Sequence, residues 1–185
     1  MREMTDLLVL DLVDKGLVTD QMVLTVGYDI ENLTDPARRA KYHGAVETDH
    51  YGRQIPKQAH GSINLDGHTS STRKIMCAVS ELFDRIVDKN LLVRRMYVVA
   101  NHVLPEADAP KKNDGAVQLD LFTDYAAEEE KQKAEDAALE RERKIQKAAL
   151  AIKKKYGKNA ILKAMNLEEG ATAKDRNAQI GGHKA

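Results

Sequence analysis

The sequence contains no tryptophan, one cysteine and few aromatic residues. Tyrosine and phenylalanine together make up 4% of its 185 residues, whereas charged residues make up 31%. A single cysteine cannot form an intramolecular disulfide, and Cys77 lies in an apolar helical pattern that predicts an inert thiol in the core. Hydrophobic residues amount to 42%, which is enough for a core in part of the chain. We therefore expect a modest globular unit followed by a solvated, helical remainder.

The chain also lacks an excess of charge of either sign. It has 29 Lys and Arg residues against 29 Asp and Glu residues, so its formal net charge is zero. Zero net charge gives no overall attraction to nucleic acid or to an acidic membrane, and any nucleic-acid contact must come from local basic patches. No signal-peptide pattern opens the sequence and no apolar run approaches the length of a membrane span. We therefore expect a cytoplasmic protein with no membrane partner.

Hydrophobic periodicity predicts regular elements in the first 104 residues. Residues 2–15 are densely apolar and end at Gly16, which favours a helix, although a run of this length could also be a buried strand. The later patterns predict, in order, strands at 21–29 and 59–66, a helix from Thr69, Ser70 or Ser71 to about Lys89, and a strand at 91–104. This order implies an α+β domain over residues 1–104, with two helices on one face of a small antiparallel sheet.

Alternation places Met22, Leu24 and Val26 on one face of the first strand. In the last strand it places Tyr97 and Val99 on one face, and Arg94 and Arg95 on opposite faces. The apolar face of the helix that ends at about Lys89 includes Ile75 and Val79.

Three other stretches are predicted to lie outside a compact core. Residues 30–58 form a long polar connection between two predicted strands, and connections of this length are usually functional or mobile. Residues 105–124 form a linker whose first part is rich in Pro, Asp and Lys. Residues 169–185 are predicted to be a disordered tail.

A long charged helix is predicted between the linker and this tail. It runs from about Tyr125 to Tyr156 and is acidic early and basic late, a gradient that complements the helix dipole. A shorter helix at 158–165 completes a helical tail over residues 125–168. Apolar residues of the long helix repeat every seven positions and predict a narrow seam for docking or weak pairing, formed by Ala138, Ile145 and Ile152.

The linker carries the pentapeptide QLDLF, which places large apolar residues in polar surroundings. Such residues usually bind in a pocket of a partner protein. The alternative is a hydrophobic turn that folds back onto its own domain. A Gln amide can both donate and accept hydrogen bonds in a small polar pocket, while Leu121 and Phe122 can fill an apolar cleft. The peptide resembles the one with which bacterial DNA polymerases and repair factors dock on the sliding clamp. The resemblance assigns clamp binding to Gln118, Leu119, Leu121 and Phe122.

Two further stretches resemble one protein family. The segment HGSINLDGHTSSTRKIMCAVSELFDRI at 60–86, followed by LLVRRMYVVA at 91–100, resembles the C-terminal little finger domain of Y-family translesion DNA polymerases. The ImpB/MucB/SamB-type DNA repair proteins resemble it most, and residues 153–185 look like the end of the same group. The resemblance implies a little-finger-like fold that binds primer–template DNA and docks on the replication clamp during damage bypass.

The catalytic part of this family has no counterpart in the sequence. These polymerases hold two magnesium ions with acidic residues of an N-terminal palm domain, and nothing here resembles palm, fingers or thumb. We therefore expect no catalytic residue and no cofactor, with Mg²⁺ confined to the absent palm. The family's little finger also opens with a strand before the first helix, and in a split βαβ order that absent strand would be central.

These departures leave two interpretations of the chain. The first is a C-terminal fragment of a translesion polymerase, from an enzymatic family but inactive alone. The alternative is a stand-alone, non-catalytic protein that binds the clamp or the catalytic part of a polymerase.

The resemblance also implies that basic side chains and backbone amides grip DNA phosphates, which positions DNA without reading its sequence. An ordinary solvated surface is the alternative for the same basic residues. The histidines between His43 and His68 match no zinc signature, so no metal site is predicted. The candidate phosphate contacts are Arg38, Arg39, Lys41, Arg53, Lys57, Arg73, Lys74, Arg94 and Arg95.

Overall fold

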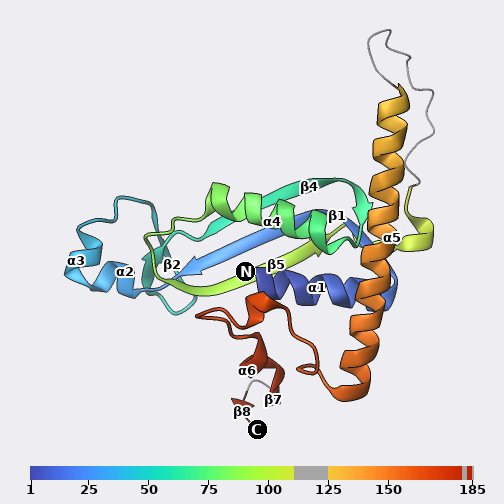
Figure 1. The fold of residues 1–185 in the computed structure, drawn as a ribbon. Helices are drawn as coiled ribbons and strands as arrows, with labels where there is room; N and C mark the ends of the chain where they lie inside the picture. The colour runs from blue at the N-terminus through green and yellow to red at the C-terminus, as the bar shows by residue number, and fades with distance from the viewer. Residues whose placement is uncertain (111–124, 181–182, 185) are drawn as a thin grey trace.

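A computed structural model of the chain describes residues 1–110, 125–180 and 183–184, and it has the predicted α+β class (Figure 1). The main elements are α1 (Arg2–Lys15), β1 (Leu17–Tyr28), β4 (Ala59–Thr69), α4 (Thr72–Ile86), β5 (Val93–Asn101) and α5 (Tyr125–Tyr156). The shorter ones are α2 (Glu31–Thr34), α3 (Pro36–Arg39), β2 (Val46–Thr48), β3 (Gln54–Pro56), β6 (Leu104–Pro105), η1 (Glu106–Asp108), η2 (Ala164–Asn166), α6 (Ala173–Asn177), β7 (Gln179–Ile180) and β8 (His183–Lys184).

The sheet is built around β1. Its strand order is β4-β1-β5, both pairings are antiparallel, and β6 pairs with the beginning of β1. Leu24 lies opposite Gly61 on one side and opposite Val98 on the other. The prediction that a central strand is absent is therefore wrong, because the backbone groups of β1 are already paired on both sides.

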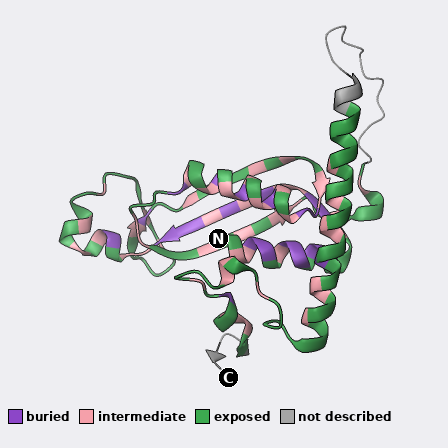
Figure 2. Cartoon of the chain, in the orientation of Figure 1, coloured by how far each residue is buried: buried purple, intermediate pink, exposed green. Residues whose placement is uncertain are grey.

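Both longer helices of the domain pack on one face of this sheet. Strand alternation turns Met22, Leu24 and Val26 toward the helices, and all three are fully buried. They meet the apolar faces of α1 and α4, so that the buried residues concentrate along β1 and these helices (Figure 2). Gly61 allows the close approach of α4, since a Cβ there would lie 3.1 Å from Leu82 Cδ1 and 3.2 Å from Ile86 Cγ2.

Local signals fix the ends of these helices. Gly16 ends α1 in a left-handed conformation at φ 66°, and Ser71 begins α4 by accepting a hydrogen bond from the Lys74 amide at 3.2 Å. The prediction of a buried Cys77 is wrong, because its side chain is exposed. The buried stripe of α4 passes through Ile75 and Val79, and a residue two positions after Ile75 points to the opposite side of a helix.

The long helix α5 stands across the end of the sheet where β4 leads into α4 (Figure 1). Glu142 accepts hydrogen bonds from Ser71 Oγ at 2.6 Å and from the Arg73 amide at 2.9 Å. Gln146 is buried and donates to the Ser70 carbonyl oxygen and to Thr72 Oγ1, each at 2.9 Å. These polar contacts fix α5 on the N-terminal end of α4.

The predicted apolar seam of α5 is not the face that docks on its own domain. Ile145 is 63% exposed and Ile152 is 36% exposed. The docking face lies beside it and is mainly polar, with Leu150 packed against the apolar core. Pairing of the seam with another protein stays a prediction.

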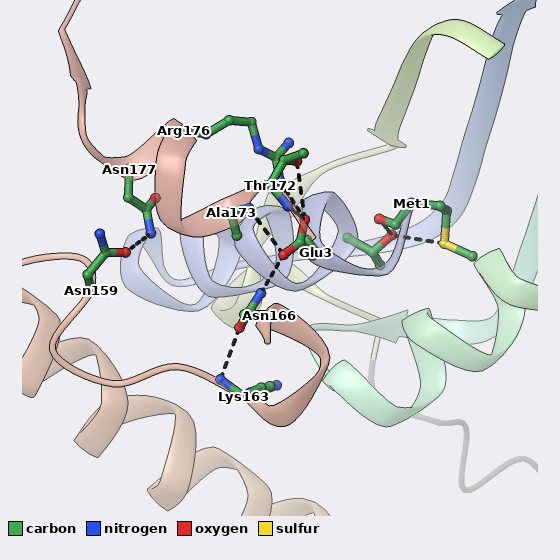
Figure 3. A network of polar contacts seen from close by, with 10 residues as sticks. Met1, Glu3, Asn159, Lys163, Asn166, Thr172, Ala173, Arg176 and Asn177 are labelled. Carbon is green, nitrogen blue, oxygen red and sulfur yellow. Dashed lines mark hydrogen bonds and ion pairs between the residues drawn. The ribbon is translucent and has the colours of Figure 1, made fainter. Parts of the chain in front are cut away.

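The segment after α5 differs from its prediction. Instead of a helix at 158–165, the structure has only the 3₁₀ turn η2, and α6 occupies part of the region predicted to be disordered. Ala173 at the start of α6 is only 2% exposed. Figure 3 shows the cause, because hydrogen bonds from this segment converge on Glu3 of α1.

Within the described parts of the chain, no helix combines the length and the apolar composition that a bilayer crossing requires.

Candidate nucleic-acid interface

The face of the sheet opposite α1 and α4 is exposed. Alternation along the three strands turns every second residue away from the helices. On the edge strand β5 this includes Tyr97, which is 50% exposed, and Val99, which is 46% exposed. We call this surface the open sheet face and define it by the residues Gln21, Val23, Thr25, His60, Ser62, Asn64, Arg95, Tyr97, Val99 and Asn101.

Cross-strand hydrogen bonds hold the polar side chains of the open sheet face in place. Asn101 Nδ2 donates to Gln21 Oε1 at 2.9 Å, and Gln21 Nε2 donates to Asn64 Oδ1 at 2.8 Å, which makes one row of amides across the sheet. In a second row, Thr25 Oγ1 and His60 Nδ1 are hydrogen-bonded at 2.8 Å. Side chains paired in this way lose little further conformational entropy when a ligand binds.

Arg95 lies flat across the central strand. A Cβ on Gly27, its partner in β1, would come within 2.9 Å of Arg95 Cγ and 3.1 Å of Arg95 Nε, so the arginine occupies the space that glycine leaves open. Its guanidinium carbon is 5.8 Å from the centre of the Tyr97 ring, within the range of a cation–π contact. The open sheet face therefore presents a cation and an aromatic ring side by side.

Arg95 is the cation among the residues that define the open sheet face. None of the residues that define it carries a carboxylate, and Asp20 and Asp66 follow the row of Gln21 toward α5. Asp20 is paired with His102 at 2.8 Å and with His68 at 3.7 Å. At the edge of β4, Arg85 of α4 reaches round to donate to the Ser62 carbonyl oxygen at 3.0 Å. An anion near Arg95 would thus meet a basic group, whereas one at the row of Gln21 would lie beside Asp20 and Asp66.

The two arginines at the start of β5 have different surroundings. Arg95 belongs to the open sheet face, whereas Arg94 is exposed, falls at the register shift between β1 and β5, and lies 3.7 Å from Asp29. Arg95 is therefore the candidate phosphate contact that the structure combines with an open surface.

Arg73 and Lys74 lie away from the open sheet face. They are in the first turn of α4, on the helix side of the sheet, where Lys74 Nζ is 2.6 Å and Arg73 Nη2 is 3.8 Å from Glu135 of α5. In this arrangement both cations help to hold α5.

The predicted polar connection at 30–58 folds into α2, α3 and the β2–β3 hairpin, at the end of β1 remote from α5 (Figure 1). Here Arg53 forms two hydrogen bonds with Asp49 Oδ2, at 2.7 and 2.9 Å, and these bonds hold the pKa of the Asp49 carboxyl below its usual range. Arg38 lies 3.7 Å from Asp35, and Arg39 donates to the Tyr42 carbonyl oxygen. Lys41 and Lys57 are exposed.

Sequence reasoning missed Tyr97 as a candidate, although it placed this residue and Val99 on one side of their strand. The missing information was which side the helices cover. His60 was considered only as a metal ligand, and its bond to Thr25 depends on the pairing of β1 with β4. The predicted clamp-binding residues Gln118, Leu119, Leu121 and Phe122 lie outside the described residues.

No group of three or more His, Cys, Asp and Glu side chains in the described ranges could hold a metal ion. No family model, curated protein or solved structure matches the chain. The function is therefore argued from the residues of the open sheet face and from the sequence.

Proposed function

We propose that this chain is the DNA-binding and clamp-docking C-terminal part of a translesion DNA polymerase, which acts in DNA repair and damage bypass in the cytoplasm. The observation that supports this proposal most is the open sheet face, an exposed surface with Arg95 beside Tyr97 and no carboxylate among its defining residues. The catalytic palm and its Mg²⁺ would belong to another part of the enzyme.

On this proposal the open sheet face lies along the phosphate backbone. Arg95 supplies a planar guanidinium that suits a phosphate, and amide and hydroxyl side chains from the other strands add neutral hydrogen-bond donors. Phosphate contacts carry no sequence information. Because this kind of binding does not involve the bases, it tolerates a damaged base. Exposed basic residues next to the sheet, such as Lys57, would extend the contact beyond β1.

The clamp peptide would supply a second, independent attachment. Burial of Leu121 and of Phe122 contributes about 1.5–3 kcal/mol each, offset by the entropy of ordering the linker. A docking peptide with an affinity in the micromolar range results. It becomes useful because binding to the clamp raises the effective concentration of the open sheet face near DNA.

A matched pair of arginines tests the DNA contact. We expect Arg95→Gln to weaken binding to a short DNA duplex about tenfold, because one charge-assisted hydrogen bond is lost. The slope of log Kd against log salt concentration should also fall by about one, which corresponds to the loss of one phosphate contact. Arg94→Gln changes the neighbouring residue, which lies at the register shift of β5 beside the carboxylate of Asp29, and should leave both quantities nearly unchanged. Fluorescence anisotropy at several salt concentrations measures both, and equal effects of the two variants would reject the open sheet face as the DNA surface.

The exposed seam on α5 favours a second candidate function. With Ile145 63% exposed, α5 offers an apolar surface through which a stand-alone, non-catalytic protein could bind the clamp or the catalytic part of a polymerase. The two functions differ in their gene neighbourhood. An upstream reading frame that encodes palm and fingers favours the polymerase fragment, whereas a solitary gene with its own promoter favours the stand-alone protein.

A further inference from the structure

Tyr97 is an aromatic residue on the exposed face of the sheet. Aromatic residues make up 4% of the sequence, yet this ring is 50% exposed on the open sheet face, with Val99 beside it on the same strand and 46% exposed. Neither side chain contributes to the core between the sheet and the helices. An exposed aromatic ring in an ordered sheet offers a flat surface to a planar ligand.

The surroundings of Tyr97 favour a nucleobase as that ligand. Its neighbour across the strand pair is Thr25, and the residue beyond Thr25 is His60, so a tyrosine ring and an imidazole lie in one row across the sheet. Two strand spacings separate the backbones of Tyr97 and His60 by about 10 Å. The guanidinium of Arg95 adjoins the tyrosine ring and can meet the phosphate of a nucleotide whose base stacks on Tyr97.

We propose that Tyr97 and Arg95 form a stacking site for an unpaired base, so that the open sheet face prefers single-stranded DNA to duplex. This inference rests on the proposed DNA-binding function and specifies its substrate. In a duplex, the faces of each base are covered by the neighbouring bases, and only a single strand can present a base to Tyr97. Stacking of this kind accepts any base, because every base has a π face.

Tyr51 serves as a control for Tyr97. Tyr51, in the turn of the β2–β3 hairpin, is 78% exposed, and Arg53 lies 5.1 Å from its ring centre. It therefore has the same arginine–tyrosine pairing as Tyr97 but lies outside the sheet. If single-stranded DNA binds to the open sheet face, replacing Tyr97 will weaken this binding more than replacing Tyr51.

Fluorescence anisotropy with a labelled thymidine oligonucleotide and with a duplex of the same length tests the inference on the full chain. We expect tighter binding of the single strand by the unmodified protein. Tyr97→Leu should weaken single-strand binding about 5- to 100-fold, the range for loss of one base–aromatic stack. It should change duplex binding little. Tyr97→Phe keeps the ring and should retain the affinity, and Tyr51→Leu should have the smaller effect.

Cross-linking provides a readout that does not depend on the folding of a variant. A thymidine oligonucleotide that carries one 5-iodouracil, irradiated with the unmodified chain, should yield an adduct at Tyr97 that mass spectrometry identifies. Adducts elsewhere, with none at Tyr97, would overturn the inference.

The outcomes separate this inference from the proposed function. Equal or tighter binding of the duplex, or an unchanged affinity of Tyr97→Leu for the single strand, overturns the stacking site. Duplex binding that depends on Arg95 would then still support the proposed function. If the chain binds neither DNA, both proposals are overturned.

Discussion

Replacing Gln118, Leu121 and Phe122 together with alanine is expected to abolish binding of this chain to a purified sliding clamp. The two apolar side chains contribute about 1.5–3 kcal/mol each when buried in a partner. Their joint loss therefore weakens binding by more than about 100-fold, which takes a micromolar interaction beyond detection. Isothermal titration calorimetry with the full chain and the clamp measures the effect.

A second variant excludes a general hydrophobic effect. Ile145→Ala and Ile152→Ala together remove the exposed seam of α5, which also presents apolar surface to a partner. This double variant should bind the clamp as tightly as the unmodified chain. If the seam variant loses binding and the peptide variant keeps it, α5 and not the pentapeptide is the clamp ligand.

The second large effect is expected at Glu3, which ties the C-terminal segment to α1 (Figure 3). Its carboxylate accepts hydrogen bonds from the amides of Thr172 at 3.0 Å and Ala173 at 3.1 Å, and from Asn166 Nδ2 at 3.0 Å. Arg176 Nη2 lies 3.3 Å from the same group, and the Glu3 side chain is only 14% exposed. Much of the polar anchoring of the segment around η2 and α6 therefore passes through one side chain.

Glu3→Ala should release this segment from α1. It leaves the amides of Thr172 and Ala173 without their acceptor, and we expect a loss of about 1.5–3 kcal/mol of local stability, the range for hydrogen bonds to a charged group. Hydrogen–deuterium exchange should show faster exchange in residues 163–178, with little change in the sheet. Asp11→Asn is the matched control, because Asp11 is an exposed carboxylate of α1 that pairs with Lys15 of the same helix. Unchanged exchange at 163–178 in Glu3→Ala would show that other contacts hold the segment.

The same contact should depend on pH. Burial alone would raise the pKa of Glu3, but the hydrogen bonds from Asn166, Thr172 and Ala173 and the charge of Arg176 hold it below the ordinary value. A carboxyl whose pKa is lower in the folded state stabilises that state above the pKa of the unfolded chain, about 4.3. Exchange protection of residues 163–178 should therefore be constant at neutral pH and fall as the pH drops below about 4.5. In Glu3→Ala this loss of protection should be absent.

Local patterns in the sequence predicted the elements of the domain. The alternation of Met22, Leu24 and Val26 predicted their common face, and the apolar spacing of Ile75 and Val79 predicted the buried side of α4, because both depend only on neighbouring residues. The composition of the long helix predicted its bounds, which match those of α5.

Contacts between distant residues were not predictable in the same way. The tail resembles a disordered segment in composition, and its order depends on Glu3, which lies 170 positions before Ala173. The docking of α5 uses Glu142 and Gln146, polar residues whose partners lie 71 and 76 positions away. The apolar seam of α5 did not predict the face that docks on the domain, because α5 is held mainly by hydrogen bonds.

In the candidate site, too, local patterns were predictable and contacts between distant residues were not. Alternation predicted that Tyr97 and Val99 share one side of their strand, but it could not tell which side stays exposed. That depends on where α1 and α4 pack and on the pairing of β1 with both of its neighbours. Tyr97 became a candidate only when the covered side was known.

Valine methyl groups give the most direct test of the claim that the open sheet face binds DNA. Val23 and Val99 lie opposite each other on this face, whereas Val26 and Val98 belong to the helix side of the same two strands. In methyl NMR spectra of the chain titrated with DNA, we expect the signals of Val23 and Val99 to shift while those of Val26 and Val98 stay in place. The account would be contradicted if the signals of Val26 and Val98 shift while those of Val23 and Val99 do not. It would also be contradicted if DNA binds and none of the four signals shifts.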